Sequence, residues 1–378
     1  MHALQLNFFL DWRRSPGDIL RHWQGLSDVA VAAAAGGANI SVVQACATQA
    51  ILVDRGIDFH FIPPASPGTP LTRTRAFTRL LAQLAPDVVH VHGLGFPREV
   101  LDLRTLSPEL PILLQDHADR VPRFWRRSVM RRSLDKCTGV SFCARAQAEP
   151  FRGAGLLGPH VEVFEIPEST SSFQPGDQAA ARAACGIHGD PAVLWVGHLN
   201  ANKDPLTILE AVSIARRRLP GLQLWFCFGS APMHQAVEAR IAREVELREC
   251  VHLLGRVPHE QVETLMRAAD LFVLGSHREG SSFSLIEALA TGLTPVVSAI
   301  PSLRVLTGNG AVGALFPCGD AHACADALQR AAFSLQPGAR ERVRAFFDAH
   351  LSHTAIGRRF AEAYDRIRGG ARVTSTAA

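Results

Sequence analysis

The chain has 378 residues, of which 47% are hydrophobic and 20% charged, and its formal net charge is +4. This length suits two domains of near-equal size, and this composition excludes a disordered protein. The small net charge gives no indication of nucleic-acid binding, and no apolar run approaches the roughly 18 residues that a membrane-spanning helix needs.

Strand-like and helix-like segments alternate through the first half of the chain. The opening segment, Ala3–Phe9, is predicted to be a strand rather than a signal peptide, because Asp11 and Arg13 follow it without a basic n-region. Helices are predicted at Gly17–Ala35 and Thr74–Leu84. The further predicted strands are Ile40–Ala45, Phe59–Ile62, Val88–Val91, Ile112–Gln115 and Gly139–Phe142. Such alternation predicts a parallel sheet covered by helices.

Three histidines of the first half lie at predicted strand ends. His90 and His92 share one face of their strand, because alternate residues do so, and His117 comes just past the next strand. A metal site is one interpretation of three histidines. Their spacing has no ligand-pair signature and no acidic third ligand is evident, so we expect no metal. Each of them also fits a hydrogen-bonded structural histidine.

A basic segment, Arg120–Arg132, combines six arginines with Phe124, Trp125, Val129 and Met130. A basic helix with aromatic residues is typical of contact with an anionic membrane surface, and the segment predicts such peripheral contact. A solvated helix face is the alternative interpretation.

The eight cysteines are scattered and form no Cys-x-x-Cys pair, and several lie in apolar stretches, such as Cys227. This usage predicts buried thiols in a reducing compartment. The expected location is the cytoplasm, with peripheral attachment to the inner face of the membrane through the basic segment.

The stretch Glu165–Asp190 is rich in Ser, Pro and Gly, and we predict the linker there. Beyond it the alternation resumes, with strands predicted at Val193–Val196, Gln223–Phe228, Val251–Leu254, Leu271–Leu274 and Thr294–Ser298. The chain is therefore expected to form two doubly wound α/β domains facing a cleft, over residues 1–170 and 171–350.

The loop after the first strand of the second domain predicts a phosphate site. Gly197 ends the strand, and Asp204-Pro205 is a typical helix start, with Asp as N-cap and Pro as the first helical residue. A phosphate beside Lys203 would gain the helix dipole and a charge-assisted hydrogen bond. Only Lys136 and Lys203 are lysine among 39 basic residues, which favours a need for a compact ammonium at 203. An exposed loop lysine is the alternative.

The stretch Ala269–Ala299 carries the most informative pattern. A short apolar strand leads into a polar loop with Glu279, and a helix follows from about Ser284 to Thr291, with Glu287 near its first turn. Strand-end loops of open parallel sheets bind ligands. The backbone N–H groups of Ser282 to Leu285 are free at the helix start and can hold an anion. Two carboxylates beside an anion site suit a nucleotide sugar.

A hydrolase with the two glutamates as acid and nucleophile is the main alternative. Eight residues of helix would separate Glu279 from Glu287 by about 12 Å, whereas a retaining glycosidase needs its carboxyls roughly 5–5.5 Å apart. A loop that folds back would shorten the separation, so this alternative is disfavoured rather than excluded. A charge favoured by the helix dipole would also explain Glu287 by itself.

The segment REGSSFSLIEALATGLTPVV resembles the signature of glycosyltransferase family 4, the retaining glycosyl transferases of group 1. In that family two glutamates separated by seven residues precede an Ala, a turn with Gly and a Pro. Glu279 and Glu287 match the glutamates, and the rest are matched by Ala288, Gly292 and Pro295. The resemblance, specific over roughly residues 190–330, implies the GT-B fold, with two Rossmann-like domains facing a cleft.

The resemblance also implies roles for other residues. In the family an Arg and a Lys hold the donor diphosphate; Lys203 matches the Lys, whereas His198 stands where Arg is usual. Glu287 matches the residue that holds the ribose, and Glu279 can reach the transferred sugar. The residues expected to bind the donor are Gly197, His198, Lys203, Arg256, Val257, Glu279, Gly280, Ser282, Phe283, Ser284 and Glu287, of which Arg256 and Val257 flank the base.

On the acceptor side, the resemblance places His92 in the cleft and His117 near the reacting sugar. The first loop offers only Gly17 where the family has paired glycines. His117, Glu279 and Lys203 are the expected catalytic residues, and Gly17 and His92 the expected acceptor-side residues. The final segment, 351–378, is expected to contain a helix from about Ser352 to Ile367 that packs back across the domain join, followed by a flexible tail.

The sequence therefore predicts a retaining glycosyltransferase that moves a sugar from a nucleoside diphosphate sugar to a glycan, lipid-linked sugar or small molecule. The nucleotide sugar is a co-substrate, and no cofactor, metal or nucleic acid is expected. Two alternatives stay open. One is a nucleotide-sugar epimerase of GT-B type, and the other is a non-catalytic module that binds sugar nucleotides.

Overall fold

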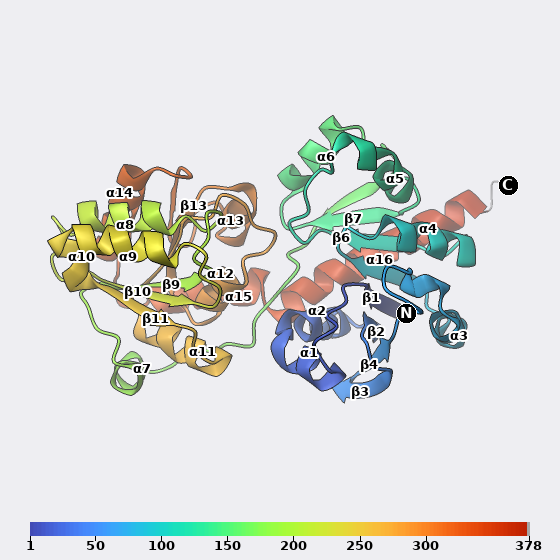
Figure 1. Ribbon diagram of the computed structural model, residues 1–378, viewed down its shortest axis with the longest axis horizontal. Coiled ribbons are helices and arrows are strands. Elements are labelled where there is room, and N and C mark those ends of the chain that lie inside the picture. Colours follow the sequence, from blue (N-terminus) through green and yellow to red (C-terminus); the bar gives the residue numbers. More distant parts are fainter. Residues whose placement is uncertain (376–378) are drawn as a thin grey trace. The chain divides into compact units, whose positions relative to one another are not determined.

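The computed structural model describes residues 1–375, and the chain divides into two compact α/β units (Figure 1). Unit 1 comprises Met1–Thr170 together with the final helix, α16 (His353–Ser375), and unit 2 comprises Ser171–Ser352. The chain passes from one unit to the other within the predicted linker. The central part of each unit is a twisted sheet with helices packed against it.

Unit 1 contains an eight-stranded sheet with the order β3-β4-β2-β1-β5-β6-β7-β8. Neighbouring strands are parallel, except that β3 and β4 are antiparallel. The strands are β1 (His2–Asn7), β2 (Asn39–Ala45), β3 (Ala50–Asp54), β4 (Ile57–Ile62), β5 (Val88–His92), β6 (Ile112–Gln115), β7 (Gly139–Phe142) and β8 (Glu162–Glu165). The central strands β5, β6 and β7 are buried along their whole length, which is typical of a sheet covered on both faces.

Helices cover both faces of this sheet because alternate strand residues point to opposite faces and both sets are apolar. One buried cluster includes Leu6 and Val91 with residues of α3 to α6, and the other includes Ala3 and Val42 with residues of α2 and α16. The helical segments are α1 (Pro16–His22), α2 (Gln24–Ala35), η1 (Leu71–Arg73), α3 (Arg75–Leu84), α4 (Pro97–Leu106), α5 (Phe124–Leu134), η2 (Arg145–Ala148), α6 (Glu149–Gly153) and α16.

The final helix packs against α2 within unit 1. Gly36 and Gly357 allow the two backbones to meet, because a Cβ on Gly357 would fall against the carbonyl oxygen of Ala32. Phe360 and Tyr364 lie fully buried in the same contact. The helix is therefore part of the unit 1 core. It begins one residue later than predicted, at His353, and continues past the predicted end at Ile367 to Ser375, so the prediction of a flexible tail directly after Ile367 is wrong. Residues 376–378 lie outside the described residues.

Unit 2 contains a six-stranded sheet with the order β11-β10-β9-β12-β13-β14, and all its strands are parallel. The strands are β9 (Ala192–Gly197), β10 (Gln223–Phe228), β11 (Val251–Gly255), β12 (Leu271–Leu274), β13 (Thr294–Ser298) and β14 (Ala314–Phe316). The helices are α7 (Gln178–Cys185), α8 (Pro205–Ala215), α9 (His234–Arg243), α10 (Val245–Cys250), α11 (His259–Ala268), α12 (Phe283–Ala290), α13 (Pro301–Leu306), α14 (Ala321–Phe333) and α15 (Ala339–His350). Both units are thus doubly wound, as the alternation predicts.

The differences from the sequence prediction have local causes. The single helix predicted at Gly17–Ala35 is wrong: α1 and α2 meet at Trp23, whose backbone angles, φ −111° and ψ 60°, are not helical. Its ring lies 5.5 Å from the ring of Phe9. The strands that the sequence analysis misses, β3, β8 and β14, all lie at sheet edges and are only five, four and three residues long. Helix α7 forms inside the predicted linker, with Asp177 as its N-cap.

Candidate functional site

The predicted donor residues meet at the carboxyl edge of the unit 2 sheet. The chain passes from β9 outward to β10 and β11 and then returns to β12 on the other side of β9. Such a switch point opens a crevice at the carboxyl ends of the strands. Lys203 follows β9 and Glu279 follows β12, so two neighbouring strands bring these residues together.

The helix start that follows Lys203 holds it in place. Helix α8 begins at Pro205, as predicted, and Asp204 is its N-cap. The Asp204 carboxylate accepts hydrogen bonds from the Thr207 N–H at 3.3 Å and from the Thr207 hydroxyl at 2.8 Å. The N–H of Lys203 donates to Oδ1 of Asn200 at 3.0 Å. These bonds order the loop between β9 and α8.

Lys203 and Glu279 form an ion pair that joins two loops. The Nζ of Lys203 lies 2.5 Å from Oε1 of Glu279, and the side chains are only 15% and 12% exposed. The side-chain amide of Asn202 donates to the Arg278 carbonyl at 2.9 Å, and the His277 N–H donates to the Asn202 carbonyl at 2.8 Å. The charge of Lys203 is therefore already opposed by the carboxylate expected to reach the transferred sugar.

The helix after this loop has an N-terminus without a side-chain cap. Helix α12 begins at Phe283, one residue earlier than predicted, and its N-cap residue, Ser282, makes no capping hydrogen bond. Gly280, Ser282 and Ser284 are buried, whereas Phe283 is exposed. Uncapped N–H groups at a helix start favour an anion, which agrees with the predicted phosphate position.

Glu287 is paired with a histidine that the sequence analysis misses. It is the fifth residue of α12, one turn in from the helix start and so near the predicted first turn. Its Oε1 lies 2.6 Å from Nε2 of His259, the first residue of α11. The His259 ring in turn lies 4.9 Å from the ring of Phe173. His259 is the last residue of the predicted base loop, Gly255–His259, and this position is the only signal in the sequence.

The predicted base loop lies beside Glu287. Burial and the charge of Glu287 raise the pKa of the Cys227 thiol, a hydrogen bond with the Val257 backbone lowers it, and the resulting pKa is about 11. His259, at the end of the predicted loop Gly255–His259, bonds to Glu287, which brings this loop to the residue expected to hold the ribose.

His198 is neutral in this structure. Its Nδ1 accepts a hydrogen bond from the Ser230 N–H at 3.1 Å, which leaves the ring proton on Nε2. Burial lowers the pKa of His198, and the nearby charges of Lys203 and Arg256 lower it further. The position where the family has an arginine therefore carries no positive charge.

In unit 1, the predicted acceptor-side histidines belong to one hydrogen-bonded chain. The Nδ1 of His117 lies 2.5 Å from Oε2 of Glu168, a buried carboxylate at the end of the unit. The Nε2 of His117 lies 3.3 Å from Nδ1 of His92, and Nε2 of His92 lies 3.4 Å from Oε1 of Gln5. His90 stacks on His92 and bonds to the Tyr364 hydroxyl at 2.8 Å. His90 and His92 share one strand face, as predicted.

The charges in this chain are uneven. Burial lowers the pKa of His90 to about 3 and lowers that of His92 well below its usual value, with help from the neighbouring histidines. Burial opposes protonation of His117 too, but the charge and hydrogen bond of Glu168 outweigh it, and the pKa of His117 is raised. Burial also raises the pKa of Asp116 to about 7. His117 is therefore the histidine of the chain that protonates most readily, and Glu168 is the partner that the sequence analysis misses.

Gly17 has no close neighbour that requires a glycine. It is the second residue of α1, and a Cβ built on it would meet no atom within 4 Å. Ser15 begins α1 with a capping box, in which its side chain accepts from the Asp18 N–H. The place of Gly17 among the acceptor-side residues stays a prediction.

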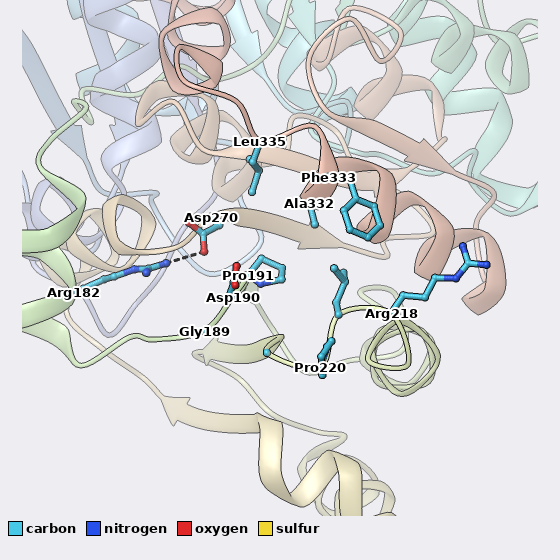
Figure 2. A pocket seen from close by; sticks show the side chains of 12 residues that line it. Arg182, Gly189, Asp190, Pro191, Arg218, Pro220, Asp270, Ala332, Phe333 and Leu335 are labelled. Atoms are coloured by element: carbon cyan, nitrogen blue, oxygen red, sulfur yellow. Dashed lines mark hydrogen bonds and ion pairs between the residues drawn. The ribbon is translucent and has the colours of Figure 1, made fainter.

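The cavity drawn in Figure 2 lies at the opposite, amino edge of the unit 2 sheet. It has a volume of about 600 Å³ and is lined by residues just before β9, β10 and β12 and at the end of α14. Within it, Arg182 pairs with Asp270 at 2.7 Å, and Asp270 also accepts the N–H of Ala192 at 2.8 Å. These bonds attach α7 to the sheet. The predicted donor residues do not line this cavity.

Among residues 1–375, no three His, Cys, Asp or Glu side chains are arranged to hold a metal ion. Within the same range, none of the helices is long and apolar enough to cross a membrane. Transfer without a metal stays a prediction, because it concerns the reaction rather than the resting protein.

Comparison with known proteins agrees with this geometry. Residues 177–342 match the family model described as Glycosyl transferases group 1. A D-inositol 3-phosphate glycosyltransferase from Nocardia farcinica is 32% identical over 202 residues, which cover 52% of this chain and 44% of that relative. The chain spans less than half the length of the curated relatives it matches. The predicted relationship to the glycosyl transferases of group 1 is confirmed across the matched residues.

Two solved structures resemble the whole chain. Sucrose-phosphate synthase from Thermosynechococcus elongatus has a TM-score of 0.69 at 20% identity, covering 98% of this chain and 100% of that one. HepE from Anabaena, in complex with UDP and glucose, has a TM-score of 0.67 at 17% identity, covering 97% and 100%. This likeness confirms the predicted GT-B fold of two parallel-sheet domains.

The Lys203–Glu279 pair predicts a measurable coupling in stability. Lys203→Met and Glu279→Gln each leave one largely buried charge without its partner, so the double variant should lose less than the sum of the single losses. We expect a coupling free energy of about 0.5–3 kcal/mol from denaturant unfolding of the four proteins. The exposed pair Arg152–Glu149 is the control and should couple by less than about 1 kcal/mol. A coupling no larger than that of the control would contradict the pairing.

The Glu168–His117 pair predicts a pH dependence. Because the folded pKa of His117 is raised, its contribution to stability is fully present below the unfolded value of about 6.5. This contribution is lost as the pH rises through the folded pKa. Glu168→Gln should lower the pKa of His117 in an NMR titration. It should also remove the part of the free energy of unfolding that depends on protonation of His117. Glu149→Gln, at an exposed carboxylate, serves as the control. A His117 pKa that does not move in Glu168→Gln would show that Glu168 does not set it.

Proposed function

We propose that this protein is a retaining glycosyltransferase that moves a sugar from a nucleoside diphosphate sugar to an acceptor hydroxyl. The observation that carries the proposal is the Lys203–Glu279 pair beside the uncapped start of α12. A phosphate at that helix start gains from the dipole and from N–H donors. A carboxylate in the adjoining loop suits sugar hydroxyls. The family match of residues 177–342 supports the same activity.

The two glutamates serve different parts of the donor in this proposal. Glu287 lies with His259, which ends the loop that carries Val257, and we assign it to the ribose. Glu279 lies with Lys203, and we assign it to the transferred sugar. During transfer, the bond from the anomeric carbon to the diphosphate oxygen breaks, the acceptor oxygen bonds to that carbon, and the acceptor proton leaves. Negative charge grows on the departing diphosphate, so donors that face it lower the barrier.

We assign the acceptor, a glycan, lipid-linked sugar or small molecule, to unit 1. Its sheet reverses beside β1, as the unit 2 sheet does beside β9, so its carboxyl edge is a switch point too. His117 lies at this edge, held by Glu168 on one side and His92 on the other. A sugar oxygen can accept a hydrogen bond from Nε2 of His117 in place of the 3.3 Å bond to His92. Gly17 follows β1 at the same edge.

The proposal includes no cofactor and no divalent metal. No Asp-x-Asp pair, which could hold a divalent metal, ends a strand in the sequence. The N–H groups and cations at the carboxyl edge of unit 2 can neutralise the charge of the diphosphate instead. The nucleotide sugar is a co-substrate.

A panel of nucleotide sugars tests the proposal against its alternatives. Binding to the folded protein raises its unfolding temperature, so a thermal-shift screen identifies the donor. The proposal requires transfer from that donor to an acceptor hydroxyl. Conversion of the donor alone to an epimer would favour an epimerase. Binding without transfer, hydrolysis or epimerisation would favour a non-catalytic module. Glu279 and Glu287 each have their own basic partner, which disfavours a hydrolase in which they share one substrate bond.

We also propose that α5 contacts an anionic membrane surface. Phe124 and Trp125, at its start, are 76% and 57% exposed, and their rings lie 5.0 Å apart. Arg126, Arg127 and Arg132 are exposed on the same helix. Aromatic side chains that enter the interface and arginines that face anionic headgroups are the features of such contacts.

The separate roles of the two glutamates are testable. Glu287→Gln should weaken binding of the bare nucleoside diphosphate and of the donor by about 1–3 kcal/mol, because a bound hydroxyl loses its charged acceptor. Glu279→Gln should lower the transfer rate and leave nucleotide affinity nearly intact, because the contacts of Glu279 involve the sugar that moves. Calorimetry and a transfer assay measure both, and Glu238→Gln, on the surface of α9, is the control. Equal behaviour of the two variants would refute the assignment.

The membrane proposal predicts a composition-dependent interaction. The protein should sediment with vesicles that contain phosphatidylglycerol more than with pure phosphatidylcholine vesicles, because only the former attract the arginines. Phe124→Ser with Trp125→Ser should reduce this binding. Phe333→Ser, at an exposed aromatic of unit 2, should not. Equal binding to both kinds of vesicle, or no effect of the double variant, would refute the contact.

A further inference from the structure

Basic side chains at the carboxyl edge of the unit 2 sheet already face carboxylates. Lys203 faces Glu279, and His259 faces Glu287. The Nε2 of His277 lies 2.9 Å from Oδ2 of Asp204. A donor diphosphate brings several negative charges to this edge, and cations that are already paired neutralise them only in part. The site therefore needs a further positive charge.

His198 does not supply this charge. Its Nδ1 is occupied as the acceptor of the Ser230 N–H, so the ring could become a cation only by breaking that bond. The chain thus departs from the arginine that the resemblance leads us to expect at this position, and another residue must take its place.

Arg256 is placed to do so. It follows β11, and the register with β10 shifts just before, so that Leu254 is an extra residue opposite Phe226 and Cys227. A bulge of this kind re-aims the side chains that follow it. A Cβ on Gly229 would lie 3.4 Å from Cε1 of His198 and 3.8 Å from Nη2 of Arg256. The guanidinium and the neutral imidazole therefore lie beside the same glycine.

The Arg256 guanidinium is also available. Its residue is exposed, and among residues 1–375 no carboxylate lies within ion-pair distance of it. Arginine donates two parallel hydrogen bonds to a phosphate, which a histidine does not. This combination of a re-aimed backbone, an unopposed charge and a neutral neighbour is not explained by a contact with the nucleobase alone.

We infer that Arg256 binds the donor diphosphate and supplies the positive charge that His198 lacks. This inference rests on the proposed function, because it assigns a ligand group to the same site. It changes the role expected from the sequence, in which Arg256 flanks the base. The positive charge that neutralises the diphosphate then comes from Arg256, which follows β11, rather than from His198, which follows β9.

The test compares a nucleoside diphosphate with its parent nucleoside. The probe is the tightest binder among UDP, GDP and ADP, measured by calorimetry, with the nucleoside measured by competition. Arg256→Ala should weaken diphosphate binding about ten- to hundredfold, as expected for a lost hydrogen bond to a charged group. Binding of the nucleoside should change much less. Arg243→Ala, at an exposed arginine of α9, is the matched control and should change neither affinity.

A second variant tests the replacement itself. His198→Arg in the Arg256→Ala background restores an arginine at the end of β9 and should recover at least tenfold of the lost diphosphate affinity. Equal weakening of diphosphate and nucleoside in Arg256→Ala would show a base contact and overturn the inference. So would an Arg256→Ala protein that binds the diphosphate as tightly as the wild type. If the wild-type protein binds none of the three diphosphates, the proposed function itself fails, which is a distinguishable result.

Discussion

The ion pair between Lys203 and Glu279 is the interaction on which the carboxyl edge of unit 2 depends. Two charges that are mostly out of water are stable only together, so the loops after β9 and β12 must keep one arrangement. A second set of bonds supports it: His277 bonds to Asp204, and the Cys318 sulfur lies 3.1 Å from the other ring nitrogen of His277. The same Asp204 caps α8. A substitution in the loop after β9 is therefore expected to alter the arrangement of the loop after β12.

The two units use charge in opposite ways. At the edge of unit 1, burial keeps His90 and His92 neutral, and one buried carboxylate, Glu168, makes His117 the exception. At the edge of unit 2, carboxylates face Lys203 and His259, whereas within residues 1–375 none lies at ion-pair distance from Arg256. A neutral, hydrogen-bonding surface suits sugar hydroxyls, whereas unopposed positive charge suits phosphate. The physical difference between the edges matches the division of labour that we propose.

The candidate site shows where sequence reasoning reaches its limit. Lys203, Glu279 and Glu287 are detectable because helix starts, strand ends and their spacing are local patterns. Their partners are not local. Glu279 is 76 residues from Lys203, and Glu287 is 28 residues from His259. Glu168 lies in a stretch whose composition predicts only a linker. No neighbouring residue in the sequence indicates a buried carboxylate that pairs with His117.

The two doubly wound units, the central strands and the helix start at Pro205 are predictable from local patterns, because buried parallel strands are continuous apolar runs and helix starts have local chemistry. The edge strands, the break at Trp23 and the packing of α16 on α2 emerge only from the folded chain, since these features depend on neighbours distant in the sequence. The folded chain also decides which charges are opposed. The pKa of His117 and the free guanidinium of Arg256 follow from distances in space, which residue spacing does not contain.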